Sequence, residues 1–260
     1  MNRFVVAALA ALAASPVCAD LTVEIPFTAQ SAGAPFACTD SDAGLGRAGT
    51  EVQVLDFRIF VSSANLIAAD GTPQVNTTLR GTVPDGEYRG PEFEGGVSFD
   101  GNHGESTTAP APLNLTAMFW NWRGGDKFAK IAFSPVTTAD MTVAATTQVE
   151  KAGHVGPGSG MLHLGTTLCA ASDATPPPTE PCANPNCGAG VLPGFIPGTS
   201  MVVIDPAAFG AGADLTQTTP KTSPGCMSFP HDADCTRVLL RLGMAFNALP
   251  AEQQRLVTLR

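Results

Sequence analysis

The sequence predicts a mainly β protein: a β-sandwich-like single domain with long loops, disulfide bonds and a short C-terminal helix. Within several short segments, apolar and polar residues alternate with the two-residue period of a half-buried strand. Turn signals such as Asp70-Gly71 and Gly124-Gly125 separate these segments. The 27 glycines and 22 prolines are scattered between them, as in a loop-rich β protein rather than a disordered chain.

Residues 1–19 have the pattern of a secretory signal peptide. Arg3 gives a positive start, an apolar run follows from Phe4 to Ala14, and small residues end the segment. The run is too short to span a bilayer. We therefore expect cleavage of this segment and export of residues 20–260 as a soluble periplasmic or secreted domain.

The charge balance argues against nucleic acid and membrane partners. Without the signal peptide, which carries one cation and no acid, 13 basic residues stand against 23 acidic residues, a net charge of −10. An acidic, sparsely charged protein is a poor match for nucleic acid or an anionic membrane surface. No later segment is long and apolar enough to be a membrane span. The composition suits a metal cation or a basic protein partner.

Strand signals recur along the domain. Apolar residues alternate with polar ones from Leu21 to Phe27, and a longer strand pattern runs from Val52 to Val61. Five further strand segments are predicted: Glu87–Arg89, Val97–Phe99, Lys127–Phe133, Met141–Val149 and Met201–Ile204.

Helical periodicity is mainly C-terminal. From Thr236 to Ala248 the apolar residues recur at steps of three and four, and Pro250 ends the pattern. Pro206–Gly210 predicts one short turn of helix. Residues 171–197 are rich in Pro, Ala and Gly with little apolar periodicity, which predicts an extended Pro/Gly-rich loop.

The cysteines of an exported chain indicate disulfide bonds. The close pairs Cys182/Cys187 and Cys226/Cys235 could each close a local loop, and crossed pairings are equally compatible with the sequence. A thiolate zinc site is the competing interpretation, but the spacings are looser than those of a zinc ribbon. The six disulfide candidates are Cys38, Cys169, Cys182, Cys187, Cys226 and Cys235.

No enzyme motif is present. The sequence contains no G-x-S-x-G elbow, no H-E-x-x-H and no phosphate-binding glycine loop followed by lysine. The histidines of interest are His103 and His163, because imidazole is a common copper ligand and no carboxylate cluster favours calcium or magnesium. A blue-copper site is excluded, because no cysteine is closely followed by the histidine that such a site needs.

Both tryptophans, Trp120 and Trp122, lie in the stretch MFWNWRGGDKF at 118–128. In a strand, this spacing places both indoles on one face. A tryptophan pair is more often core packing than cofactor chemistry, since each ring buries a large apolar area. Taken alone, the pattern fits a secreted, disulfide-linked β-sandwich module for adhesion or assembly, without metal.

Four segments together resemble a known family. They are VLDFRIFVSSANLIAADG at 54–71, GNHGESTTAPAPLNLTAMFWNWRGGDKF at 101–128, MLHLGTTLC at 161–169 and GCMSFPHDADC at 225–235. Their combination and order resemble the MbnP-like family, exported proteins named for a methanobactin operon and described as four-cysteine members of a "metallo-mystery pair". The chain departs from the family pattern at Cys187, which stands where the family has an arginine. The resemblance therefore implies an extra bridge from Cys187 to Cys38.

The resemblance implies a copper-binding protein in copper uptake or handling. Family members are encoded with a dihaem cytochrome c peroxidase-like partner, similar to MauG, that oxidises a tryptophan to kynurenine. Kynurenine offers an amine and two carbonyls in place of one N–H donor, and it can share a copper site with histidine. Carried over, this implies modification of Trp120 or Trp122, with His103 and His163 as ligands of one copper ion. The protein is then the substrate of its partner and not itself a catalyst.

Overall fold

In a computed structural model of the 260-residue chain, the residues described are 20–36, 41–68, 73–76, 80–121, 123–136, 160–170, 177–215 and 218–260. The signal peptide predicted at 1–19, the strand predicted at Met141–Val149, Cys38 and Trp122 lie outside these ranges. The described chain is mainly β, which confirms the predicted fold class. Within these ranges, no helix is both long enough and apolar enough to cross a membrane.

A five-stranded sheet forms the part of the fold that carries the candidate site. Its central strand β11 (Gly125–Pro135) pairs antiparallel with β5 (Thr50–Ile59) on one side and with β12 (Gly160–Gly165) on the other. Strand β4 (Ser41–Leu45) extends the sheet beyond β5, and β10 (Phe119–Asn121) forms a hairpin with the start of β11. The predicted strand Lys127–Phe133 lies within β11.

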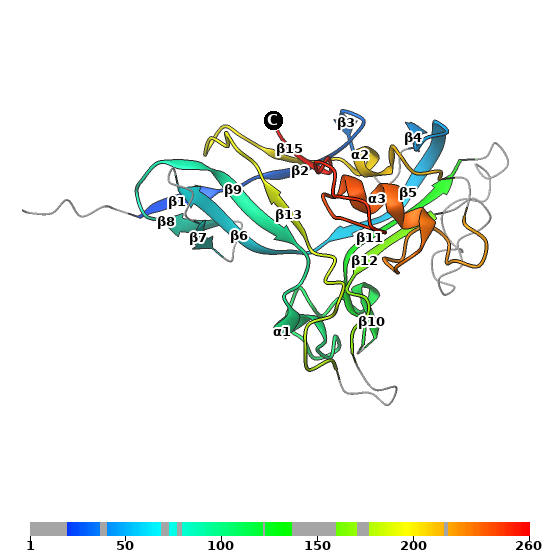
Figure 1. The fold of residues 1–260 in the computed structure, drawn as a ribbon. Helices are drawn as coiled ribbons and strands as arrows, with labels where there is room; N and C mark the ends of the chain where they lie inside the picture. Colours follow the sequence, from blue (N-terminus) through cyan, green and yellow to red (C-terminus); the bar gives the residue numbers. More distant parts are fainter. Residues whose placement is uncertain are drawn as a thin grey trace, which may run out of the picture.

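A second sheet continues the first along the chain. At Phe60 the chain leaves β5 and enters β6 (Val61–Ala68); the Phe60 N–H donates to the carbonyl of Phe128 at 2.8 Å. Figure 1 shows the strands of the two sheets on opposite sides of an elongated molecule. The second sheet has the order β13 (Gly188–Val191), β9 (Tyr88–Gly95), β6 and β7 (Pro73–Asn76).

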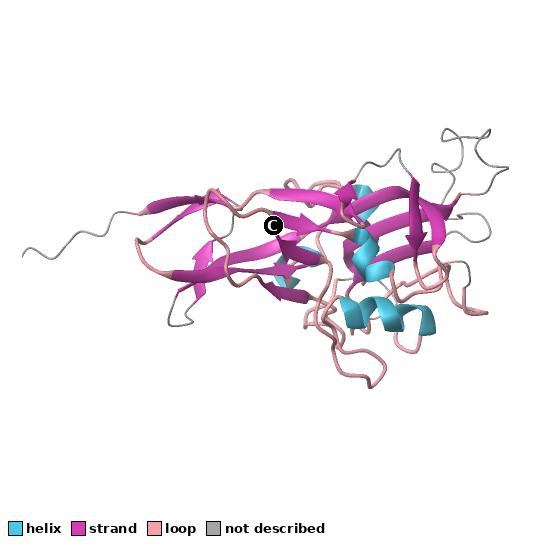
Figure 2. Cartoon of the chain, turned by 90° about the horizontal axis from the view of Figure 1, so that it is seen from above, coloured by secondary structure: helices cyan, strands magenta, loops and turns pink. Residues whose placement is uncertain are grey.

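The remaining strands form a four-stranded and a two-stranded sheet, and most strands run along the long axis of the molecule (Figure 2). Residues near both ends of the domain meet in the four-stranded sheet. There β2 (Phe27–Ser31) and β14 (Val202–Ile204) pair in parallel, and β14 also pairs with the C-terminal β15 (Val257–Leu259). β3 (Ala34–Pro35) pairs with β2 at the edge of this sheet. β1 (Leu21–Glu24) and β8 (Arg80–Val83) form the two-stranded sheet.

The helices are short, and α3 (Ala233–Arg241) completes the largest core. Its N-cap Asp232 accepts a hydrogen bond from the Asp234 N–H at 3.0 Å, which satisfies one of the free donors of the first turn. The apolar side of α3 packs against one face of the five-stranded sheet. The other helices are α1 (Phe99–Asn102), the 3₁₀ turn η1 (Thr116–Met118) and α2 (Pro206–Gly210). The buried cluster includes Phe128, Ile131, Leu162, Leu164, Val238, Leu239 and Phe246.

Three strand predictions are wrong in detail. The strand expected from Val52 to Val61 ends at Ile59, and Val61 already belongs to β6 of the second sheet. The single strand expected from Leu21 to Phe27 is two strands, interrupted around Pro26, which has no N–H for a strand ladder. The two pieces join different sheets. The segment Val97–Phe99 is not a strand, because β9 ends at Gly95 and Phe99 begins α1.

The C-terminal helix is shorter than predicted. It ends at Arg241 rather than at Ala248, because Gly243 adopts a left-handed conformation (φ +81°) that stops the helix. Phe246 still contributes to the same core from a loop, so its apolar side chain extended the helical pattern in the sequence beyond the helix itself.

The predicted loop 171–197 contains a strand, and in that respect the prediction is wrong. β13 pairs antiparallel with β9 over Gly188–Val191. The segment has no apolar periodicity, because three of its four residues are Gly or Ala. Close packing requires a glycine at Gly190, because a Cβ there would lie 2.8 Å from the ring of Phe93.

Candidate functional site

The site lies on the face of the five-stranded sheet that points away from α3. Arg58, Lys130 and His163 stand directly opposite one another on β5, β11 and β12, so their side chains share this face. Ile131 and Leu162, one position away on each strand, form the other face and contribute to the core. The strand register alone therefore sets a cross-strand row of two cations and one imidazole.

A β-bulge brings Lys127 to the same face. The register of β11 against β12 shifts between Lys127 and Ala129, and both Phe128 and Ala129 are buried in the α3 core. Without the extra residue, Lys127 and Lys130 would point to opposite faces, because they are three positions apart. Bulges commonly redirect a side chain next to a functional site.

Trp120 packs against His163 on this face. The two ring centroids are 6.1 Å apart with an interplanar angle of 63°, an edge-to-face contact. The Lys127 ammonium lies 5.9 Å from the centre of the Trp120 ring, a cation–π distance. Gly165 makes room for the indole, since a Cβ there would lie 2.8 Å from Trp120 Cζ3.

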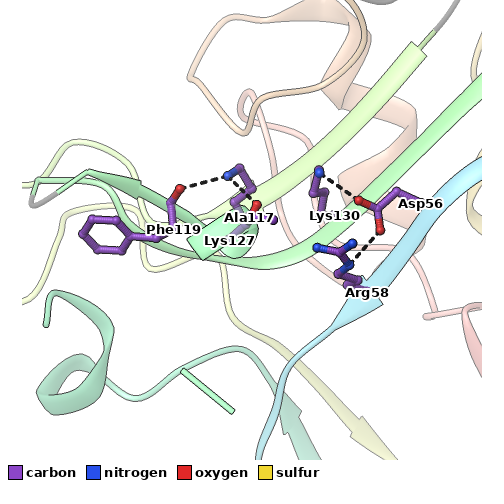
Figure 3. A network of polar contacts seen from close by, with 6 residues as sticks. All are labelled: Asp56, Arg58, Ala117, Phe119, Lys127 and Lys130. Atoms are coloured by element: carbon purple, nitrogen blue, oxygen red, sulfur yellow. Dashed lines mark hydrogen bonds and ion pairs between the residues drawn. The ribbon is translucent and has the colours of Figure 1, made fainter. Parts of the chain in front are cut away.

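Lys127 fixes the segment that carries Trp120. Its ammonium donates to the carbonyls of Ala117 (3.0 Å) and Phe119 (3.1 Å), just before the tryptophan (Figure 3). Burial, followed by repulsion from Lys130, lowers the pKa of Lys127 to about 8.

Asp56 balances the two neighbouring cations of the row. Its carboxylate lies 2.7 Å from Lys130 Nζ and 3.0 Å from Arg58 Nε (Figure 3). Lys127 instead donates to the backbone carbonyls of Ala117 and Phe119.

His163 has an unused ring nitrogen. The side chain is 9% exposed, and within the described part of the chain its Nε2 has no hydrogen-bond partner. Burial, and then the charges of Lys127 and Lys130, lower the pKa of His163 to about 4. The imidazole is therefore neutral near pH 7, and a neutral imidazole is the form that binds a metal ion.

His103 lies at the end of α1 beside a disulfide bond. The side chain is 5% exposed; its Nε2 is 3.8 Å from Cys182 Sγ and 3.3 Å from Asn102 Nδ2, and its ring packs edge-on against Phe99. Cys182 is bonded to Cys169. The atoms of His103, Cys169 and Cys182 that can bind a metal lie within 4.8 Å of one another. Part of this closeness is due to the disulfide bond, which joins the two sulfurs.

Asn102 connects the two histidine environments, and sequence reasoning did not assign it a role. It is fully buried, and its Oδ1 accepts from the Asp126 N–H at 2.7 Å while its Nδ2 lies 3.3 Å from Thr166 Oγ1. Gly125 permits this contact: it has φ +69°, and a Cβ there would lie 2.5 Å from Asn102. A buried asparagine before a histidine was the available signal, although polarity alone does not reveal burial.

The disulfides differ partly from the local pairings considered. Cys226 pairs with Cys235, one of the possibilities left open, whereas Cys182 pairs with Cys169, so the local Cys182–Cys187 bond is wrong. Cys187 forms no disulfide with another described residue, and burial raises the pKa of its thiol to about 12. The Cys187–Cys38 bridge involves a residue outside the described ranges and stays a prediction.

Two buried groups are expected to give the apoprotein opposite pH responses. The pKa of His163, about 4, lies below the usual 6.5, so the stability that its neutral form contributes is lost as pH falls through this interval. Burial raises the pKa of Asp126 to about 6, so its contribution is lost as pH rises from 3.8 toward 6. Relative to the wild type, the free energy of unfolding should therefore increase at acid pH in His163→Gln and at neutral pH in Asp126→Asn.

Urea unfolding of the three proteins at several pH values measures these differences. Parallel profiles for a variant and the wild type would show that the substituted group does not titrate as described. The two variants control for each other, because their predicted slopes have opposite signs.

Of the four predicted site residues, the structure brings His163 and Trp120 into contact. His103 lies beyond Asn102 at the Cys169–Cys182 disulfide. Trp122 lies outside the described residues, so the shared face of the two indoles stays a prediction.

Comparison with known proteins identifies the family. No curated protein matches the sequence. The solved structure of MbnP from Methylosinus trichosporium superposes with a TM-score of 0.73 at 22% identity, over 93% of this chain and 98% of that one, which shows a shared fold. A sequence profile of the MbnP family matches residues 20–228, most of the domain. The chain therefore belongs to the MbnP family.

Proposed function

We propose that this protein is an exported copper-binding protein in which a tryptophan is oxidised to kynurenine and then shares a copper site with His163. One observation carries the proposal: the buried, unpaired Nε2 of His163 in a ring that packs against Trp120. An unsatisfied buried polar atom costs about 1–3 kcal/mol. A bound metal ion would satisfy this nitrogen and offset that cost.

Copper fits the available donors better than the hard cations do. The group around Trp120 offers imidazole nitrogen and, after oxidation, an aniline nitrogen, whereas calcium and magnesium prefer sets of oxygen ligands. His163 is the first ligand in this proposal. His103, joined to the same region through Asn102, is the second candidate.

The oxidation requires a partner, which we propose is a dihaem cytochrome c peroxidase-like protein using hydrogen peroxide. Two molecules of hydrogen peroxide supply the two oxygen atoms and accept the four electrons: the C2–C3 bond of the indole breaks to give N-formylkynurenine and two waters. Hydrolysis then consumes one of these waters and releases C2 as formic acid, which leaves kynurenine. Trp120 is our choice of substrate, because it contacts His163 and is held in place by Lys127. The protein itself supplies no catalyst and is the substrate of this reaction.

An exported setting agrees with the two disulfide bonds, which persist in oxidising compartments such as the periplasm. The competing proposal, a β-sandwich adhesion or assembly module without metal, explains the disulfides equally well. It gives no reason for an unpaired imidazole nitrogen at a buried position, and this difference favours the copper proposal.

The test is co-expression with the partner, followed by intact mass measurement of the wild type, Trp120→Phe and Trp122→Phe. We expect the wild type and Trp122→Phe to show one residue that has lost a carbon and gained an oxygen, and Trp120→Phe to lack it. The converted protein should also absorb in the near ultraviolet beyond the tryptophan band. Conversion that persists in Trp120→Phe would contradict the choice of Trp120, and no conversion in any of the three would contradict the modification.

A further inference from the structure

A second donor group lies outside the Trp120 contact. The imidazole of His103 faces the Cys169–Cys182 disulfide, with Nε2 at 3.8 Å from Cys182 Sγ. His103 and Cys182 are 5% and 6% exposed, and Cys169 is half-buried. Two sulfurs and one imidazole nitrogen thus converge at the end of α1.

We propose that reduction of the Cys169–Cys182 bond converts these three residues into a binding site for one thiophilic metal ion, with ligands from His103 and both thiolates. Two thiolates with an imidazole form a ligand set that suits soft or borderline ions such as Cu(I) and Zn(II). In the oxidised protein the sulfurs carry no negative charge and are bonded to each other. The disulfide therefore keeps the site closed.

The step that opens the site is thiol–disulfide exchange with a dithiol reductant. A thiolate of the reductant attacks Cys169 Sγ, the S–S bond breaks, and Cys182 leaves as a thiolate beside His103. The second thiol of the reductant then displaces Cys169 and forms the reductant's own disulfide. Two electrons and two protons pass to the pair, and metal binding releases the protons.

The backbone keeps the two cysteines together without the covalent bond. Thr167 and Asn184 exchange two hydrogen bonds of 3.0 and 3.1 Å, and the Ala183 N–H donates to the Leu168 carbonyl at 3.2 Å. Leu168 and Ala183 are the immediate neighbours of Cys169 and Cys182. These contacts hold the thiols close to His103 after reduction, so the ligands are preorganised for a metal ion.

The other disulfide provides an internal comparison. Cys226 and Cys235 are buried in the α3 core at 2% and 0% exposure, so a reductant reaches Cys169 more readily. Among the described residues, the His103 group is the only set of at least three histidine, cysteine or acidic side chains with metal-binding geometry, so the second pair lacks a third ligand there.

This site shares His103 with the proposed copper centre but does not require tryptophan oxidation. The two proposals can therefore fail separately. If His103 binds copper in the oxidised protein, reduction of the disulfide supplies two competing sulfur ligands beside it.

The experiment uses Cd²⁺ as the probe, with unconverted protein in a Cys38→Ser/Cys187→Ser background, which removes the two cysteines outside the Cys169–Cys182 and Cys226–Cys235 bonds. After mild dithiol treatment and anaerobic removal of the reductant, we expect one equivalent of Cd²⁺ to bind with a thiolate-to-metal charge-transfer band in the ultraviolet. The oxidised protein should show no such band. His103→Ala should weaken Cd²⁺ binding about 10- to 100-fold or more.

His231→Ala is the matched control, because His231 is exposed and lies in the other disulfide loop. It should bind Cd²⁺ like the parent. The proposal is overturned if the reduced protein binds no Cd²⁺, or if His103→Ala binds it as tightly as His231→Ala does. A parallel copper titration of oxidised, tryptophan-converted protein reports on the proposed function alone.

Discussion

Replacement of His163 by alanine is expected to abolish stoichiometric copper binding in protein that has been converted by its partner. The affinity should fall by at least about 100-fold, because substitutions outside the ligand shell already cost about 10- to 100-fold. The imidazole of His163 packs against Trp120 and has an unpaired Nε2, so its removal takes away the first ligand of the proposed site. Competition titration with a copper chelator measures the loss.

His231→Ala is the control for this experiment, since it removes an exposed imidazole and leaves the sheet untouched. A circular dichroism spectrum and urea midpoint close to those of the parent would show that His163→Ala still folds. His103→Ala, measured beside it, tests the second ligand. If His163→Ala binds copper like His231→Ala, the ligand assignment is wrong, whatever happens to Trp120.

Leu239→Ala is expected to produce the largest loss of stability, about 2–5 kcal/mol in the free energy of unfolding. Leu239 is fully buried on α3, in the core cluster formed against the five-stranded sheet. The substitution removes apolar burial and leaves a cavity that a core between a helix and a sheet cannot fully close. Urea unfolding measures the change.

Leu168→Ala is the matched control, because that leucine is 59% exposed. It should change the free energy of unfolding by less than about 0.5 kcal/mol. Similar losses in the two variants would contradict the placement of α3 in the core. Because Leu239 lies on the opposite face of the sheet from His163, Leu239→Ala should leave copper affinity unchanged in the fraction that remains folded.

Several features of the fold followed from local pattern. Alternating residues predicted the strands that became β5 and β11, and the Pro206–Gly210 turn appears as α2. The predictions failed where a local pattern had more than one physical cause. Phe246 lies at a helical step from Leu242 in the sequence but contributes to the core from a loop. The apolar pattern did not predict β13, because its residues are small and Gly190 makes room for Phe93.

The candidate site was predictable as a set of residue types but not as an arrangement. The few histidines and the paired tryptophans selected His163 and Trp120, and the structure brings these two rings together. The part played by Lys127 depends on a bulge that adds one residue to β11 against β12. A bulge is a property of two paired strands, so the sequence of one strand does not reveal it.

The sequence by itself predicted a mainly β protein with disulfide-forming cysteines, which the structure confirms, and an exported copper-binding protein, which stays a proposal. These conclusions rest on composition, period and order along the chain. Only the tertiary structure decided that Trp120 lies against His163, that Cys169 pairs with Cys182, and that His103 faces that bond. The physical reason is that strand register and long-range packing set distances between residues far apart in sequence, and no local pattern encodes those distances.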